Sequence, residues 1–119
     1  YHTLREWYAQ CIAVCIPLSG DANDTCGYTN MLEAMAMRKP VLMTQSGCLH
    51  INPKNDGFGI QIKPRDTQGW VDAMNHLHQD HEKALGMGNR GREIVERDFT
   101  IERFNQDVLG FIKTILNKR

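Results

Sequence analysis

The pattern of apolar and polar positions divides the chain into short strands and longer helical segments. Residues 12–16 are five consecutive apolar residues, which is typical of an interior strand covered on both faces of a parallel sheet. Residues 41–44 form a second apolar run, and residues 58–62 alternate as a third strand does. Together with the helical segments, these runs predict an α/β fold: part of a Rossmann-like doubly wound parallel sheet of about three strands, with flanking and C-terminal helices.

Helical periodicity and capping residues place the helices. Residues 4–10 read as the end of one helix and residues 28–37 as a second, while residues 45–57 read as an irregular loop. Asp66 or Thr67, then Asp80, then Thr100 are expected to cap three further helices. The first carries the apolar residues Trp70, Val71, Met74 and Leu77, and the second carries Leu85, Ile94 and Val95. The buried face of the third is predicted to comprise Ile101, Phe104, Val108, Phe111, Ile112 and Ile115. Trp7, Trp70 and the methionine-rich positions are expected in the core.

The segment from Thr25 to Val41 combines a glycine-containing loop with a helix that ends before Pro40. The loop glycine can adopt positive φ, and either Thr29 or Asn30 can cap the helix that follows. Glu33 lies four residues after Thr29, on a helical face different from the apolar one. A carboxylate one turn into a helix, behind a loop with free backbone N–H groups, is an arrangement that can hold a phosphorylated sugar.

This segment resembles a known signature. Residues 33–36, Glu-Ala-Met-Ala, followed by Lys-Pro-Val at 39–41, are similar to the donor-site motif of retaining glycosyltransferases with the GT-B fold, family 4. Weaker similarities extend over nearly the whole chain, at residues 7–9, 11–17, 56–60, 63–66 and 99–100. The block at 33–41 is the most specific of these.

The resemblance implies a site for a nucleotide-sugar donor. Glu33 would accept hydrogen bonds from the ribose 2′- and 3′-hydroxyls, and the N–H groups at the helix start would hold the diphosphate. The donor-binding residues it implies are Glu33, Thr29, Tyr28, Gly27, Cys26 and Thr25. An alternative stays open for each part: Asn30 and Glu33 can form a capping box, and the helix start can be an ordinary one that binds water.

Two positions depart from the family pattern. Thr25 stands where the family has the first glutamate of its motif, which usually contacts the transferred sugar, and Asp24 or Asp21 could substitute for it. Arg38 stands where the family often has glycine, and we expect it at the surface in a left-handed helix cap. The loss of the first glutamate favours an alternative function, that of a non-catalytic binding or scaffold relative that has lost donor recognition.

The resemblance also implies a larger parent protein. Residues 1–119 would be the C-terminal portion of a donor-binding domain, without the upstream part of that domain and without the acceptor domain. The parent would transfer a sugar from a nucleotide donor to a saccharide, lipid or small-molecule acceptor, as in polysaccharide biosynthesis, with no metal required. The 119 residues alone would contain no catalytic residue and be inactive. The expected location is cytoplasmic, or peripheral at the inner membrane through other parts of the parent.

Composition and charge limit the kinds of partner that we expect this chain to bind. The chain carries 14 Lys and Arg against 14 Asp and Glu, so we expect no nucleic-acid partner. Its four cysteines have no CxxC spacing, and we expect them reduced. His76, His78 and His81 fall on different sides of a helix or across its end, which argues against a metal site.

The first predicted strand also suggests self-association. Its neighbour in a doubly wound sheet would lie upstream of Tyr1. The run from Cys11 to Ile16 contains no lysine, and proline comes only at its end, so its open edge is unprotected. We therefore expect copies of the chain to associate through Cys11–Ile16.

Overall fold

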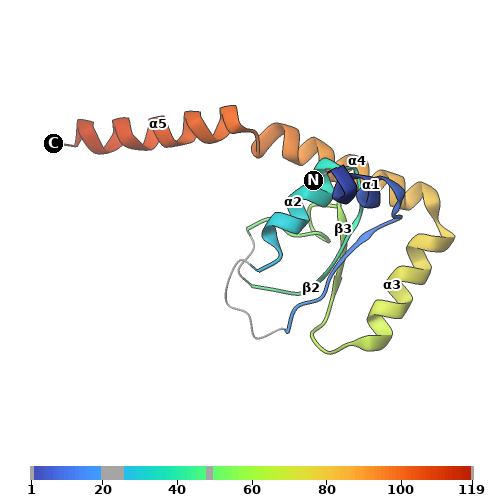
Figure 1. Cartoon of the computed structure of the whole chain (residues 1–119). Helices are drawn as coiled ribbons and strands as arrows, with labels where there is room; N and C mark the ends of the chain where they lie inside the picture. Colours follow the sequence, from blue (N-terminus) through green and yellow to red (C-terminus); the bar gives the residue numbers. More distant parts are fainter. Residues whose placement is uncertain (1, 20–25, 48–49, 119) are drawn as a thin grey trace.

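The computed structural model describes residues 2–19, 26–47 and 50–118. Figure 1 shows the arrangement of the helices and strands. Their bounds are α1 (His2–Gln10), β1 (Val14–Ile16), α2 (Tyr28–Ala36), β2 (Val41–Thr44), β3 (Gly59–Ile62), α3 (Thr67–Gln79), α4 (His81–Asp98) and α5 (Ile101–Asn117).

The three strands form one parallel sheet in the order β1-β2-β3. Val14 of β1 is paired with Val41 of β2, which is paired in turn with Gly59 of β3. All four residues of the central strand β2 are buried. The predicted α/β class, with a Rossmann-like parallel sheet of three strands and flanking helices, is therefore confirmed.

Helices cover both faces of the sheet, and alternate residues of β2 point to opposite sides. Val41 and Met43 belong to a buried cluster with residues of α2 and α4. Leu42 belongs to a second cluster, with residues of α3 and the first turn of α4. Figure 1 shows α3 separated from α2 by the sheet. The core is thus two apolar layers, because the side chains of a strand alternate between its faces.

Glycines allow α4 to approach α2 closely. A Cβ on Gly88 would overlap the carbonyl oxygen of Arg38, at the end of α2, and a Cβ on Gly91 would lie 3.1 Å from Cγ of Met35. These glycines therefore serve helix packing. Arg38 itself has φ of 57° and an exposed side chain that donates to Asn89 across this contact. Its predicted left-handed cap position is confirmed.

Three of the predicted helix caps are present. The Asp66 carboxylate accepts from the N–H of Gly69 at 2.8 Å, and Asp80 accepts from the N–H of Lys83 at 2.9 Å. The Thr100 hydroxyl accepts from the backbone N–H of the third residue after it. Each side chain satisfies one backbone donor that the helix leaves unpaired.

The prediction that the first strand is covered on both faces is wrong for the described residues. β1 is an edge strand that pairs only with β2 among the strands described. Ile12, just before it, is 41% exposed, and Cys15 within it is exposed. Trp7 was expected in the core but is 68% exposed. No other residue of α1 is buried either. The open edge on which the predicted self-association depends is present.

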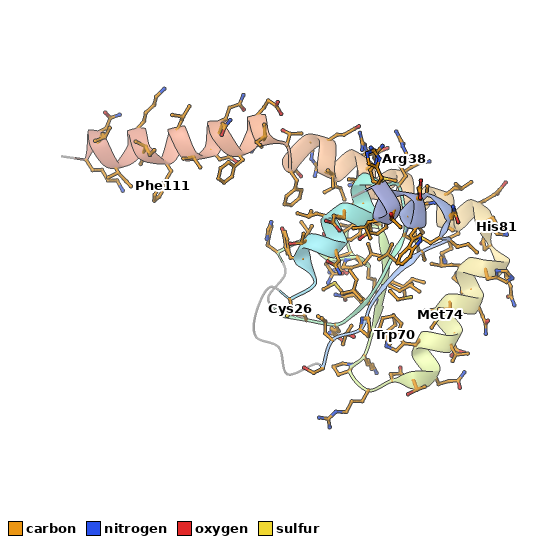
Figure 2. All side chains as sticks on the ribbon, viewed as in Figure 1. Cys26, Arg38, Trp70, Met74, His81 and Phe111 are labelled. Carbon is orange, nitrogen blue, oxygen red and sulfur yellow. The ribbon has the colours of Figure 1, made fainter. Side chains whose placement is uncertain are left out.

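Helix α5 has no buried residue, although its apolar face was expected to be buried. All six residues of that face are exposed, and Phe111 is 67% exposed. Figure 1 shows α5 projecting from the packed layers, and Figure 2 shows Phe111 far out on it. The radius of gyration is 16.3 Å, against about 13.5 Å for a compact domain of this length. Met74, also expected in the core, is exposed on α3.

Candidate functional site

Helix α2 begins at the carboxyl edge of the sheet. Its N-cap is Gly27, with φ of 79°, a residue that has no side chain to form a cap hydrogen bond. A Cβ on Gly27 would lie 2.6 Å from Cγ2 of Ile16 and 3.3 Å from Cε of Met43. The chain therefore reaches the start of α2 directly over the ends of β1 and β2. Thr29 and Asn30, expected as caps, lie instead within the first helical turn and are exposed.

A side-chain hydrogen bond ties the loop after β1 to the end of β2. The N–H of Leu18 donates to Oγ1 of Thr44 at 2.9 Å, and Thr44 is buried. Since Thr44 is the last residue of β2, this bond fixes the start of the loop that leads to α2. In open parallel sheets, ligands bind at this edge, outside the carboxyl ends of the strands.

Glu33 lies on α2 less than two turns after its start and is half-buried. The capping-box interpretation of this residue is wrong, because the helix begins at Tyr28 and Asn30 is already inside it. The hydroxyl of Tyr8, on α1, instead donates to Oε2 of Glu33 at 2.9 Å. A carboxylate can accept about four hydrogen bonds, so this contact leaves most of its acceptor capacity for a ligand.

The pKa of Tyr8 is raised from 10.0 to about 12, first by burial and then by its hydrogen bond to the Glu33 carboxylate. Ionised Tyr8 would place a second negative charge beside Glu33. At neutral pH the phenol therefore remains a donor, and it holds the carboxylate in position without neutralising it.

Three aromatic rings pack together beside the start of α2. Tyr28 stacks on His50 with 5.9 Å between ring centroids, and its edge meets Phe99 at 6.2 Å. The Tyr28 hydroxyl and Nε2 of His50 are 3.4 Å apart, and burial raises the pKa of Tyr28. No pattern in the sequence predicts this cluster. Its members lie on α2, in the loop before β3 and after α4, and no sequence spacing links them.

Two hollows flank this region. The first, about 520 Å³, is lined by Leu32, His50, Ile51, Asp98, Phe99, Thr100, Arg103, Phe104 and Asp107. The second, about 380 Å³, lies at the carboxyl edge of the sheet on the side of α3, and is lined by Pro17, Leu18, Ser19, Thr44, Arg65, Asp66, Thr67 and Trp70. None of these residues was among the predicted site candidates. The sequence signal for the second hollow is that residues 17–19 and 65–67 follow predicted strands and that Thr44 ends one.

The structure thus brings only some of the predicted site residues together. Gly27, Tyr28 and Glu33 are half-buried along α2, and Cys26 and Thr29 are exposed at its start. The remaining candidates, Thr25, Asp24 and Asp21, lie outside the described residues.

The described part of the chain contains no group of three His, Cys, Asp or Glu side chains that could hold a metal ion. The rings of His78 and His81 contact each other with centroids 6.2 Å apart, at the junction of α3 and α4. A search of the same residues found no helix with the length and apolar character needed to cross a membrane.

The three-stranded parallel sheet and its flanking helices define an α/β domain with a Rossmann-like fold. A family model described as glycosyl transferases group 1 matches residues 1–80. Because this match covers more than half of the chain, including the sheet, α2 and the Glu33 motif, the chain belongs to that family. Neither a search of curated proteins nor a search of solved structures found a match.

Proposed function

We propose that the chain is the C-terminal portion of the nucleotide-sugar-binding domain of a retaining glycosyltransferase with the GT-B fold, family 4. The observation that carries this proposal is Glu33. It belongs to the motif within the family match, and it lies on the helix that begins over the carboxyl ends of β1 and β2.

The spacing between Glu33 and the helix start supports a ribose role. A helix rises 1.5 Å per residue, so Glu33 lies about 6–8 Å along the axis from the first helical N–H groups. This is about the reach from a pyrophosphate to the hydroxyls of its ribose. The N–H groups of Gly27, Tyr28 and Thr29 would bind the diphosphate, where the helix dipole favours an anion.

Tyr8 has a positioning role in this proposal. Its hydroxyl fixes Oε2 of Glu33, so the carboxylate does not have to be ordered when the ribose binds. Fixing a ligand-binding group in advance reduces the entropy that binding would otherwise lose. Cys26 and Thr25 would be further donor-binding residues, as the resemblance to the family motif implies.

Sugar recognition depends on Thr25. A hydroxyl at this position, instead of the family's glutamate, would weaken contacts with the transferred sugar but leave the nucleotide contacts intact, unless Asp24 or Asp21 replaces it. The same substitution is the observation that favours the second candidate, a binding or scaffold relative without donor recognition.

The rest of the proposal concerns the parent protein. It would contain the upstream part of the donor domain and an acceptor domain, and would transfer a sugar to a saccharide, lipid or small-molecule acceptor without a metal. We propose a role in polysaccharide biosynthesis and a location in the cytoplasm, or at the inner membrane through other parts of the parent.

Substitution of Glu33 tests the proposal in a parent protein that carries residues 1–119. Glu33→Ala should weaken nucleotide-sugar binding by about 1.5–3 kcal/mol, as expected for lost hydrogen bonds to a charged group. The exposed Glu93, on α4, is a matched control, and Glu93→Ala should leave donor affinity unchanged. Calorimetric titrations with a nucleoside diphosphate and with the intact donor measure both variants, and similar affinities for these two ligands would support weak sugar contact at Thr25.

Tyr8→Phe separates a binding role of Glu33 from a structural one. It removes the hydroxyl that contacts Glu33 but keeps the carboxylate, so donor affinity should fall less than in Glu33→Ala. If Glu33→Ala leaves donor affinity unchanged and lowers the melting temperature as Tyr8→Phe does, the carboxylate only joins α1 to α2. In that case the donor proposal is wrong and the scaffold alternative is favoured.

A further inference from the structure

Helix α1 has little packing on the rest of the domain. All nine of its residues are exposed except Tyr8, which is half-buried against the cluster that contains Met31 and Met35. A hollow of about 310 Å³ is lined by four residues of α1 and by Met37, which follows α2, so the two helices do not close against each other there. A helix of this length is marginal alone in water. α1 therefore depends on a few contacts to remain folded.

Two side chains from the Glu33 motif hold α1 in place. The Tyr8 hydroxyl donates to Oε2 of Glu33 at 2.9 Å, and Nζ of Lys39 donates to the carbonyl oxygen of Ala9 at 3.0 Å. The Ala9 carbonyl lies in the last turn of α1, where a helix leaves its carbonyls unpaired and its dipole favours a cation. α1 has no basic residue in that turn, so Lys39 supplies the positive charge.

We propose that α1 is a two-state element, docked or released, whose docking is coupled to ligand binding at Glu33. A ligand on Glu33 favours the docked state, and release of α1 weakens binding at Glu33. A ligand shifts such an equilibrium by the difference in its affinity for the two states, and the effect is reciprocal. The coupling rests on the proposed donor role of Glu33, whereas the dependence of α1 on Glu33 and Lys39 does not.

The direction of the coupling follows from the state of Glu33. When α1 is docked, Tyr8 fixes Oε2 of the carboxylate and leaves about three of its four acceptor sites for the hydroxyls of a ribose. When α1 is released, the carboxylate can rotate, and a ribose has to order it at a cost in entropy. The nucleotide therefore binds more tightly to the docked state.

Amide hydrogen exchange in the 119-residue chain, measured by NMR without a ligand, tests the dependence of α1 on the motif. Residues 6–10 are the part of α1 whose N–H groups form intrahelical hydrogen bonds, and their exchange rate follows the fraction of released α1. Tyr8→Phe should raise this rate about tenfold, as expected for a lost hydrogen bond to a charged group. Lys39→Met should raise it about threefold, because it removes only an exposed cation from the helix end.

Two variants are matched controls for this measurement. Tyr28→Phe removes a tyrosine hydroxyl, and Lys83→Met removes a lysine from α4, without touching the contacts of α1. Both should leave the exchange of residues 6–10 unchanged. The exchange rates of α3 should be the same in all four variants, which checks that the sheet and its helices remain folded.

The ligand arm uses a parent protein that carries residues 1–119, with uridine, guanosine and adenosine diphosphates as probes. Calorimetry identifies which of these nucleotides binds. At a saturating concentration, the bound nucleotide should slow the exchange of residues 6–10 about tenfold, a common size for coupling between two sites.

The outcomes separate this proposal from the donor proposal. Unchanged α1 exchange in Tyr8→Phe would overturn the dependence of α1 on Glu33 and leave the donor proposal standing. A nucleotide that binds without slowing α1 exchange would overturn the coupling alone, and faster exchange would mean that the ribose displaces Tyr8 from the carboxylate. If none of the three nucleotides binds, the donor proposal is overturned and the coupling with it.

Discussion

Helices α2 and α5 show how little an amphipathic pattern says about burial. α5 has 17 residues with a continuous apolar stripe, yet none of them is buried. α2 has only 9 residues, but Met31, Ala34 and Met35 are completely buried between the sheet and α4. The pattern of a helix defines which face is apolar, whereas the surrounding fold decides whether another element covers it.

The difference extends to what each helix does for the domain. The contacts of α2 with β1, β2 and α4 fix the helix that carries Glu33, and this helix begins at the carboxyl edge of the sheet. No residue of α5 is buried, and its apolar side chains are exposed. We therefore expect substitutions in α2 to change folding stability much more than substitutions in α5.

The largest expected effect contrasts buried and exposed apolar side chains directly. Met35→Ala should lower the free energy of unfolding by about 2–5 kcal/mol, because it leaves a cavity beneath α4. Phe111→Ala should change it by less than about 0.5 kcal/mol, because the side chain is exposed. Urea unfolding followed by circular dichroism measures both. Equal losses would mean that α5 packs on its own domain.

The glycines of α4 give a second contrast, within one helix. Gly88→Ala should destabilise the domain by about 1–3 kcal/mol, because the new methyl group would overlap the backbone at Arg38. Gly86 has no atom within 4 Å of an added Cβ, so Gly86→Ala should stabilise the helix by up to about 1 kcal/mol. Melting temperatures that move in opposite directions would support close packing of α4 on α2; a shift in the same direction would contradict it.

The smallest expected effect is at the contact between α1 and α2. Folding raises the pKa of Tyr8 from 10.0 to about 12, so the folded state favours the protonated phenol. Its contribution to stability is complete below about pH 10 and is lost as the pH rises to about 12. Tyr8→Phe should reduce this loss of stability at alkaline pH. Tyr28→Phe should leave the contribution of Tyr8 to it unchanged. Denaturation at pH 9 and at pH 11 measures this loss of stability. An equal loss in Tyr8→Phe and in the unsubstituted protein would contradict the raised pKa of Tyr8.

Much of the fold follows from local sequence signals. Runs of apolar residues define β1, β2 and β3, and Asp66, Asp80 and Thr100 define the helix starts, because a short polar side chain can satisfy backbone donors only a few residues away. The motif around Glu33 was sufficient to indicate a glycosyltransferase, and the match over residues 1–80 confirms a domain of the glycosyl transferases group 1 family.

The tertiary structure decided which surfaces are covered and what surrounds Glu33. The hydrogen bond from Tyr8 spans 25 residues, and the cluster of Tyr28, His50 and Phe99 joins three separate segments. Such contacts leave no periodic trace in the sequence. The same reason explains α5: its residues define an apolar face, but only the arrangement of the other elements determines that this face remains exposed. Periodicity is a property of one segment, whereas burial requires a second segment to pack against it.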